Sequence, residues 1–472
     1  MRRTWAGAVL GTMLFAAGCA TNPVTGRTEL ALISESQEIA MGQQAAEEVE
    51  ASIGVVDDAE LNAYVQRVGE TLARASERPH LPWRFRVVDD PTPNAFALPG
   101  GFIYVTRGML SLMENEAELA GVLGHEIGHV TARHSVQMIS RQQLAQIGLI
   151  AGMILVPEIA RFGDLAGTGL QLLFLSYGRD AERQADDLGF KYSLQQNYDV
   201  REMPDIFQSL ARSSELAGQS PLPSWLSTHP LPQERIERIS AMLTEVTPAD
   251  RRLETAAYMQ RVDGLVYGQN PRQGFFQGST FLHPELRFRL DFPQGFQLAN
   301  LPSAVQAISE RQDAVVQFTF AEGSAAQAAS AFRQQQGVRT GQARSERINN
   351  IPAVIMPFEA QTEGGALAGY AAYIEDGQRT YQLLAYSAAQ NIRAYENAFL
   401  ATINSYQRVS DPAVLNRQPA KISAVRLPSA MTFNEFMRRY PSSIDAQELA
   451  LINQITNLSA QIPAGTWLKR VQ

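Results

Sequence analysis

The sequence predicts a multidomain α+β protein, with a mainly helical domain first and a domain of mixed strands and helices after it. Residues 115–130 repeat apolar side chains at helical spacing. Beyond residue 285, short runs alternate apolar and polar side chains as half-buried strands do. The 472 residues leave room for two or three domains, and 45% hydrophobic residues suffice for packed cores.

The first 18 residues have the composition of a signal peptide. Arg2 and Arg3 give a positive start, and residues 5–17 form an uncharged run that is short for a bilayer crossing. Ala16-Ala17-Gly18-Cys19 resembles a bacterial lipobox, although its first residue departs from the usual Leu. We expect Cys19 to become the lipidated first residue. By resemblance to bacterial lipoproteins, Ala20 then implies the periplasm and the outer membrane of a Gram-negative type cell. An ordinary signal peptide is the alternative.

Charge and cysteine content restrict the function classes further. The net charge of −8 and the pI near 5.5 argue against nucleic acid as a main partner. Cys19 is the only cysteine, so the rest of the chain has no disulfide and no thiolate chemistry. We expect polypeptide partners, and a membrane contacted through the lipid anchor.

His125-Glu126-Ile127-Gly128-His129 is an H-E-x-x-H motif inside the predicted helix. Residues four apart share a helix face, so both imidazoles can reach one zinc ion, and Glu126 lies where a general base is needed. Asn115, with Glu118 as a capping-box partner, predicts the start of the helix. We expect one side of this helix to enter the core and its flank, with both histidines, to line a cleft. Two surface histidines on an ordinary helix are the alternative.

A second helix, from about residue 177 to 196, supplies the third ligand that catalytic zinc requires. Glu182 and Asp186 share a face with Gly189 and Ser193, and these small residues would allow close approach to the histidine helix. Glu182 can then bind the metal while Asp186 orients a ligand imidazole. Taken alone, this pattern would favour the alternative, a solvated acidic helix face.

Several motifs together carry a family resemblance: Asn94–Gly101, His125-Glu126-x-x-His129 with Arg133-His134, Glu182-x-x-Ala185-Asp186, and Ser227-Thr228-His229-Pro230 with Arg235 and Ile236. This set resembles the BepA/HtpX family of zinc metallopeptidases, which includes the CAAX prenyl proteases. The resemblance covers about residues 20–245 and implies a gluzincin-type zinc peptidase domain with a small sheet over 19–245. It also implies that Glu182 is the third zinc ligand.

The same resemblance makes His229 a candidate gate over the zinc or a transition-state donor. A helix-capping histidine is the alternative. Asn22-Pro23-Val24-Thr25-Gly26 also resembles secreted lipoprotein members, whereas Gly178 stands where many members have Ser. The stretch from Phe96 to Thr106 predicts a strand, a turn and a strand, which can hold an extended peptide by backbone pairing.

Two apolar runs, residues 147–156 and 165–175, are each too short to cross a bilayer. A buried helical hairpin beside the site is one interpretation. A loop that contacts membrane or substrate is the other.

The rest of the chain predicts three further parts. Residues 246–274 form a polar helical connector, and 275–410 an α+β accessory domain with helices near 325–336 and 392–404. Residues 421–472 have a βααβ order that resembles a degenerate LysM module, whose relatives bind peptidoglycan. A purely structural end cap is the alternative.

These observations lead to one main functional hypothesis. We expect a zinc-dependent endopeptidase of the bacterial cell envelope that hydrolyses peptide bonds in misfolded or misassembled proteins, with one Zn²⁺ per chain and Glu126 as the general base. An autoinhibited chaperone or assembly factor with a protease fold is one alternative. A peptidoglycan-associated scaffold is the other.

Overall fold

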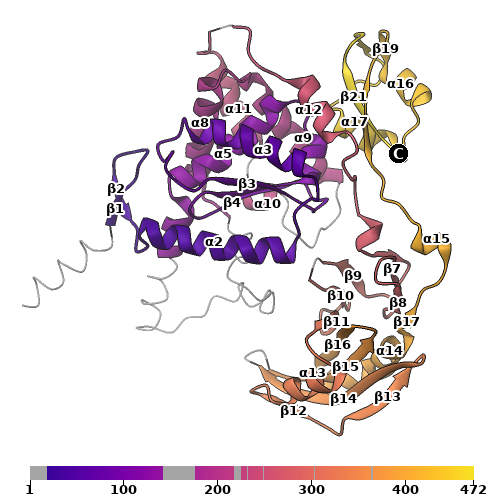
Figure 1. Cartoon of the computed structure of the whole chain (residues 1–472). Helices are drawn as coiled ribbons and strands as arrows, with labels where there is room; N and C mark the ends of the chain where they lie inside the picture. The colour runs from indigo at the N-terminus through magenta and orange to yellow at the C-terminus, as the bar shows by residue number, and fades with distance from the viewer. Residues whose placement is uncertain are drawn as a thin grey trace, which may run out of the picture. The chain divides into compact units, whose positions relative to one another are not determined.

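The computed structural model describes residues 19–141, 176–216, 225–230, 232–247, 249–301, 303–362 and 365–472 (Figure 1). The chain forms two compact units, Met1–Gly268 with Ala420–Gln472, and Gln269–Pro419. It is therefore a mixed α/β protein of more than one part, as the sequence predicts. The predicted domain boundaries stay a prediction. The predicted signal peptide and the apolar runs at 147–156 and 165–175 lie outside the described residues.

A small sheet forms the middle layer of the first unit. Its strands β3 (Arg84–Val88), β5 (Phe102–Thr106) and β4 (Ala95–Leu98) lie in that order, with β3 parallel and β4 antiparallel to β5. Helix α2 (Glu35–Ser52) packs on one face, and α3 (Ala59–Ala73) and α5 (Glu116–Thr131) on the other. Both faces are therefore apolar, and β4 is left as an edge strand.

Helix α5 packs directly against α8 (Arg179–Gln195) through glycines. A Cβ atom added to Gly128 would lie 3.0 Å from the Cα of Ala185, and one added to Gly189 would lie 2.8 Å from the backbone nitrogen of His125. Any side chain here would push the helices apart. This is the close approach that the small residues of the second helix predict.

The remaining elements of the first unit up to residue 268 surround this pair. They are β1 (Cys19–Thr21), β2 (Thr28–Leu30), α4 (Arg107–Leu112), η2 (Val200–Glu202), α9 (Met203–Leu216), α10 (Trp225–Thr228), α11 (Pro232–Leu243) and α12 (Thr255–Val262). The predicted polar connector is wrong in character, because the buried side chains of Tyr258, Met259 and Val262 place α12 in the main core. No helix in the described ranges combines the length and apolar character that a bilayer crossing requires.

The C-terminal segment returns to the first unit and shares its core. It consists of β18 (Ile422–Arg426), β19 (Met431–Thr432), α16 (Phe433–Arg439), α17 (Ala446–Ile452), β20 (Gln461–Ile462) and β21 (Trp467–Val471). Strand β18 pairs antiparallel with β21, and β19 with β20. Lys469 of β21 is fully buried and donates to the carbonyls of Ser111 and Met113, just before α5. The segment is thus tied to the start of the histidine helix.

The second unit is built on an eight-stranded sheet in the order β12-β14-β15-β16-β11-β10-β9, with β13 beside β14. Helix α13 (Ala325–Arg333) covers one face, and α14 (Ile392–Ser405) covers the other together with a small sheet, β17-β8-β7-β6. The remaining bounds are η3 (Pro271–Gln273), β6 (Phe275–Gln277), β7 (Thr280–His283), β8 (Phe288–Asp291), β9 (Gln297–Asn300), β10 (Val305–Ile308), β11 (Ala314–Ala321), β12 (Val338–Thr340), β13 (Arg344–Ile348), β14 (Ile351–Thr362), β15 (Gly365–Asp376), β16 (Arg379–Ala388), η4 (Ala389–Asn391), β17 (Gln407–Arg408) and α15 (Pro412–Leu415).

Candidate active site

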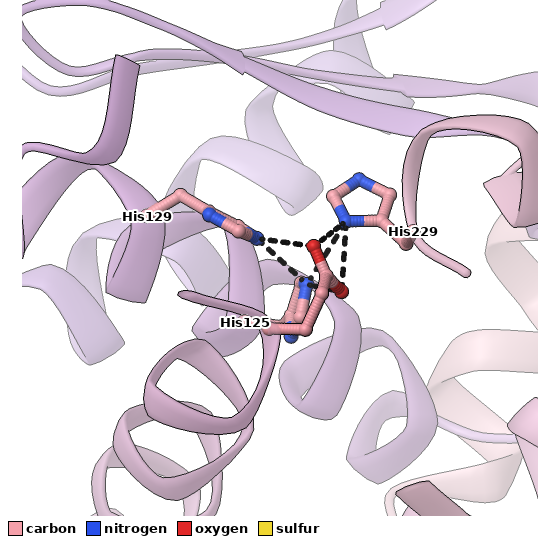
Figure 2. Close-up of side chains that lie close together, drawn as sticks. His125, His129 and His229 are labelled. Carbon is pink, nitrogen blue, oxygen red and sulfur yellow. Dashed lines mark hydrogen bonds and ion pairs between the residues drawn. The ribbon is translucent and has the colours of Figure 1, made fainter. Parts of the chain in front are cut away.

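Four buried side chains converge beside the small sheet. One ligand atom from each of His125, His129, Glu182 and His229 lies within 4.8 Å of the others. Figure 2 shows the imidazoles of His125, His129 and His229 around one carboxylate. A carboxylate oxygen of Glu182 lies 3.0 Å from Nδ1 of His229. Helix α5 supplies two of the groups, α8 the third, and the residue after α10 the fourth. The structure thus brings the predicted ligands and the predicted gate together.

The two histidines of α5 present their Nε2 atoms to the centre. These nitrogens lie 3.0 Å apart. Nδ1 of His125 faces Oδ1 of Asp186 at 2.9 Å, so Nδ1 carries the hydrogen and Nε2 keeps its lone pair. The carboxylate of Asp186 therefore fixes the orientation of the His125 ring, and its predicted role as support for a metal ligand stays a prediction.

His129 is oriented by a second pair of side chains that the sequence analysis does not assign to the site. Its Nδ1 lies 2.9 Å from Nδ1 of His134, and Nε2 of His134 lies 2.9 Å from the amide oxygen of Gln184. If His134 donates to Gln184, its Nδ1 accepts from His129. Nε2 of His129 then has its lone pair directed at the centre.

Distances and protonation of this donor set fit a zinc ion. The carboxylate oxygens of Glu182 lie 3.6 Å from Nε2 of His125 and 3.5 Å from Nε2 of His129. Ligands bound tetrahedrally at ordinary zinc distances lie about 3.4 Å from one another. Burial lowers the pKa of His125 to about 4 and holds that of His129 well below its ordinary value, which favours the neutral imidazoles that metal ligands must be. Two His and one Glu form a known catalytic zinc set.

Glu126 is buried beside this cluster. Neither of its carboxylate oxygens has a hydrogen-bond partner in the described part of the chain. Burial raises its pKa to about 7. Buried polar groups are normally paired, and a carboxylate with a pKa near neutrality can both take and give a proton. Glu126 thus has the properties of a general base.

His229 lies between the predicted base and the predicted third ligand. Its Nδ1 is 3.3 Å from Nε2 of His125, and its Nε2 is 3.5 Å from Oε1 of Glu126. The ring stacks on Trp225 at a centroid distance of 4.1 Å. An imidazole in this place can act as a fourth ligand or as a hydrogen-bond donor at the centre.

Arg235 of α11 is a site residue for which the sequence analysis gives a motif but no role. It is 3% exposed and forms an ion pair with Asp186 at 2.6 Å and another with Glu182 at 3.3 Å. Although burial opposes ionisation, Arg235 and His125 hold the pKa of Asp186 well below its ordinary value. The helical spacing of Glu182 and Asp186 could have suggested a shared cation, but α11 follows α8 only after 36 residues of other structure.

Two details of the predicted helix are corrected by the structure. All residues of α5 are buried, so the flank with His125 and His129 does not lie open along a cleft. Asn115 caps the helix by accepting from the backbone of Glu118, but the Glu118 side chain accepts from the backbone of Glu114 at 2.5 Å. The reciprocal half of the capping box is therefore absent.

Comparisons with known proteins agree with this arrangement. Residues 59–243 match Peptidase family M48. A Beta-barrel assembly-enhancing protease from Yersinia pestis is 31% identical over 48% of this chain and 48% of its own length. Metalloendopeptidase OMA1 from Danio rerio is 31% identical over 48% of this chain and 50% of its own length. The chain thus spans about half the length of these curated relatives.

Among solved structures, the cyanobacterial PsbP from Synechocystis matches 28% of this chain with a TM-score of 0.24 and 8% identity. A likeness this small supports no conclusion about fold or function.

The buried His-His-Glu cluster has the donor set of a catalytic zinc site, and the residues around it match the model of Peptidase family M48. Over residues 59–243 the chain is therefore similar to the BepA/HtpX-like zinc metallopeptidases.

Proposed function

We propose that this chain is a zinc-dependent endopeptidase of the bacterial envelope that hydrolyses peptide bonds in misfolded or misassembled proteins. The observation that carries the proposal is the juxtaposition of Glu126, buried and without a hydrogen-bond partner in the described residues, with four possible metal ligands. When bound, zinc supplies a Lewis acid for the scissile carbonyl and for the attacking water.

The remaining steps belong to side chains of this chain. His125, His129 and Glu182 hold the ion, while Asp186 and His134 fix the orientation of the two rings. Glu126 takes the proton of the attacking water at a carboxylate oxygen and passes it to the leaving amine.

The edge strand β4 is the proposed substrate-binding element. It lies at the end of the small sheet, and its neighbour α5 carries Glu126. An extended peptide can add to such an edge through its backbone, which gives tolerance for many side chains. This fits an enzyme whose substrates are unfolded segments.

The proposed location follows from the N-terminal motif and from the relatives. The lipobox-like sequence ending in Cys19 would tether the chain to the outer membrane from the periplasmic side. The names of the bacterial relatives refer to β-barrel assembly. We therefore propose outer-membrane proteins that fail to assemble as the substrates.

His229 suggests a second state in which the enzyme is shut. Its Nδ1 lies within 3.3 Å of both Glu182 and His125, so it can occupy the coordination position that a substrate needs. Such a protein could act as an assembly factor while it is closed.

The LysM-like C-terminal segment would add contact with peptidoglycan, in which case the protein would also have a scaffold role.

One set of three proteins tests the proposal. We would measure zinc content and cleavage of an unfolded protein by the wild type, Glu126→Gln and His229→Ala. We expect one zinc per chain in all three, cleavage by Glu126→Gln that is about 10²–10⁴-fold slower than that of the wild type, and faster cleavage by His229→Ala. A wild type that binds no zinc would refute the catalytic assignment, and slower cleavage by His229→Ala would refute the gate.

A further inference from the structure

The N-P-V-T-G motif after Cys19 forms the turn of a short hairpin. Strand β1 pairs antiparallel with β2, with Thr21 opposite Thr28. The side-chain oxygen of Asn22 accepts from the backbones of Val24 and Thr25 at 2.8 and 3.1 Å. Gly26 has a φ of 68°, which favours glycine. The motif therefore encodes a defined turn and not a loose linker.

The same asparagine fastens this hairpin to the histidine helix. Asn22 is 3% exposed, and its side-chain nitrogen donates to Glu29 at 2.9 Å and to the carbonyl of Ala132 at 3.2 Å. Ala132 is the C-cap of α5. Both sides of the Asn22 amide are thus in use, and neither aspartate nor a hydrophobic residue could reproduce these bonds.

Further bonds hold the residues after the hairpin to the same end of α5. The backbone of Leu32 donates to Ser140 at 3.0 Å, and Arg133 donates to the carbonyl of Ile33 at 2.8 Å. Arg78, 1% exposed, joins Glu38 of α2 to the carbonyl of Val130 at 2.8 and 2.9 Å. The hairpin is therefore joined to the end of α5 through the buried side chain of Asn22, and the segment after it through the buried side chain of Arg78.

These contacts limit the distance between Cys19 and the site. Three residues of extended chain separate Cys19 from Asn22, which is at most about 11 Å. The helix rises about 4.5 Å from His129 to Ala132. With the side chains added, Cys19 lies on the order of 20 Å from the metal ligands.

We infer that the N-P-V-T-G hairpin is a spacer of fixed length, which keeps the site close to the lipid surface to which Cys19 is attached. The substrates are then peptide bonds in membrane-proximal segments of envelope proteins, and bonds far from the bilayer are spared. This inference rests on the proposed endopeptidase activity and on the proposed lipid anchor at Cys19. It defines the substrates of that activity by their distance from the membrane.

Vesicles carrying the chain from Cys19 onward provide the test. Cys19 is the only cysteine, so maleimide lipid attaches the protein at that residue alone, whether or not a cell would acylate it. The substrate is one unstructured stretch on a membrane helix, raised from the bilayer by a straight helical spacer of 10 or 30 residues. These spacers correspond to about 15 and 45 Å. The measured quantity is the ratio of the two cleavage rates.

We expect the wild type to cut the short-spacer substrate at least tenfold faster than the long-spacer one. Asn22→Asp, which loses the donors to Glu29 and Ala132, and an insertion of 30 Gly/Ser residues after Cys19 should each reduce the ratio below three. The same insertion between the exposed residues Gly377 and Gln378 should leave it above ten.

A wild-type ratio below three would overturn the inference, and so would an Asn22→Asp ratio equal to that of the wild type. The free, soluble stretch separates this failure from failure of the proposed activity. If the wild type does not cut that stretch, the endopeptidase proposal fails and the inference falls with it. If the wild type cuts the free stretch, the ratios of the two cleavage rates decide whether the inference holds.

Discussion

Helix α5 carries two groups of buried charges, and they differ in how completely their polar atoms are paired. At its first turn, Glu118 accepts from Gln454 at 2.6 Å, and Lys469 donates to two carbonyls at 2.7 and 2.8 Å. Two turns later, neither oxygen of Glu126 has a hydrogen-bond partner in the described residues. The neighbouring imidazole nitrogens of His125 and His129 face one another at 3.0 Å.

The difference separates two uses of burial. The pairs at the first turn connect the C-terminal segment to the peptidase core, so they contribute to stability and bind their polar atoms to other groups of the protein. The atoms at the metal site are held from outside by Asp186, His134 and Arg235, and on the inner side the ligand atoms face one another at 3.0 to 3.3 Å. Buried polar groups that crowd together in this way cost stability, and they mark the part of the helix where we propose that chemistry takes place.

The largest expected effect comes from Glu126→Gln. The amide keeps the shape of the side chain but cannot take a proton, so we expect cleavage to fall by about 10²–10⁴-fold. The thermal midpoint should stay unchanged or rise, because a buried carboxylate without a partner is removed. Rate and melting curves of the purified protein check both statements. A lower thermal midpoint with an unchanged cleavage rate would show that Glu126 serves stability and not catalysis.

At the first turn the opposite pattern is expected. Lys469→Met removes the donor to Ser111 and Met113 and leaves Glu118 without a nearby cation, so unfolding should cost about 3 kcal/mol less. Three of the four tryptophans, Trp83, Trp225 and Trp467, lie in the described part of the first unit, and Trp5 belongs to the predicted signal peptide, so urea unfolding of the mature chain followed by tryptophan fluorescence reports on that unit. The exposed Lys421→Met is the control and should change stability by less than about 0.5 kcal/mol. Equal stability of the two variants would contradict the role of Lys469 in joining the C-terminal segment to the start of α5.

A smaller effect is expected from Arg235→Met, which tests the support behind the ligands. Without its ion pairs to Asp186 and Glu182, the zinc affinity should fall by about 10–100-fold. Competition with a chelator measures this, and Arg238→Met, which loses only a more exposed pair with Asp187, is the matched control. Equal affinities in the two variants would show that Arg235 is not needed for metal binding.

The last expected effect concerns the pH dependence of stability. Burial lowers the pKa of Lys469 from 10.5 to about 8, against the opposing charges of Glu114 and Glu118. Between pH 8 and 10.5 the unfolded chain keeps this proton while the folded chain loses it, so the folded state gains stability as the pH rises. The stability of the wild type relative to Lys469→Met should therefore increase across this range, as followed by urea unfolding. A constant difference would mean that Lys469 titrates normally.

Features set by local spacing could be predicted from the sequence. The H-E-x-x-H motif and the Asn115 cap depend on residues within one helix. The shared face of Glu182 and Asp186 depends on a single turn of another helix. The alternating strands of the second unit follow the same logic, because the pleat alone sets their period. For these elements the sequence and the fold agree.

Features that depend on distant segments could not be predicted. Arg235, Lys469 and Asn22 act through partners 49, 358 and 110 positions away in the chain. The complete burial of α5 has the same origin, since the C-terminal segment and the N-terminal hairpin each cover an end of it. The periodicity of apolar residues within the helix does not predict which other segments will pack on it.

The most direct test of the account is the zinc content of the wild type, Glu182→Gln and Asp180→Asn after dialysis against a chelator. Asp180 is fully exposed and lies on the same helix as Glu182, so it controls for the loss of one negative charge. We predict one zinc per chain in the wild type and in Asp180→Asn, and at least tenfold weaker binding in Glu182→Gln. Zinc retained equally by all three proteins would contradict the assigned metal site.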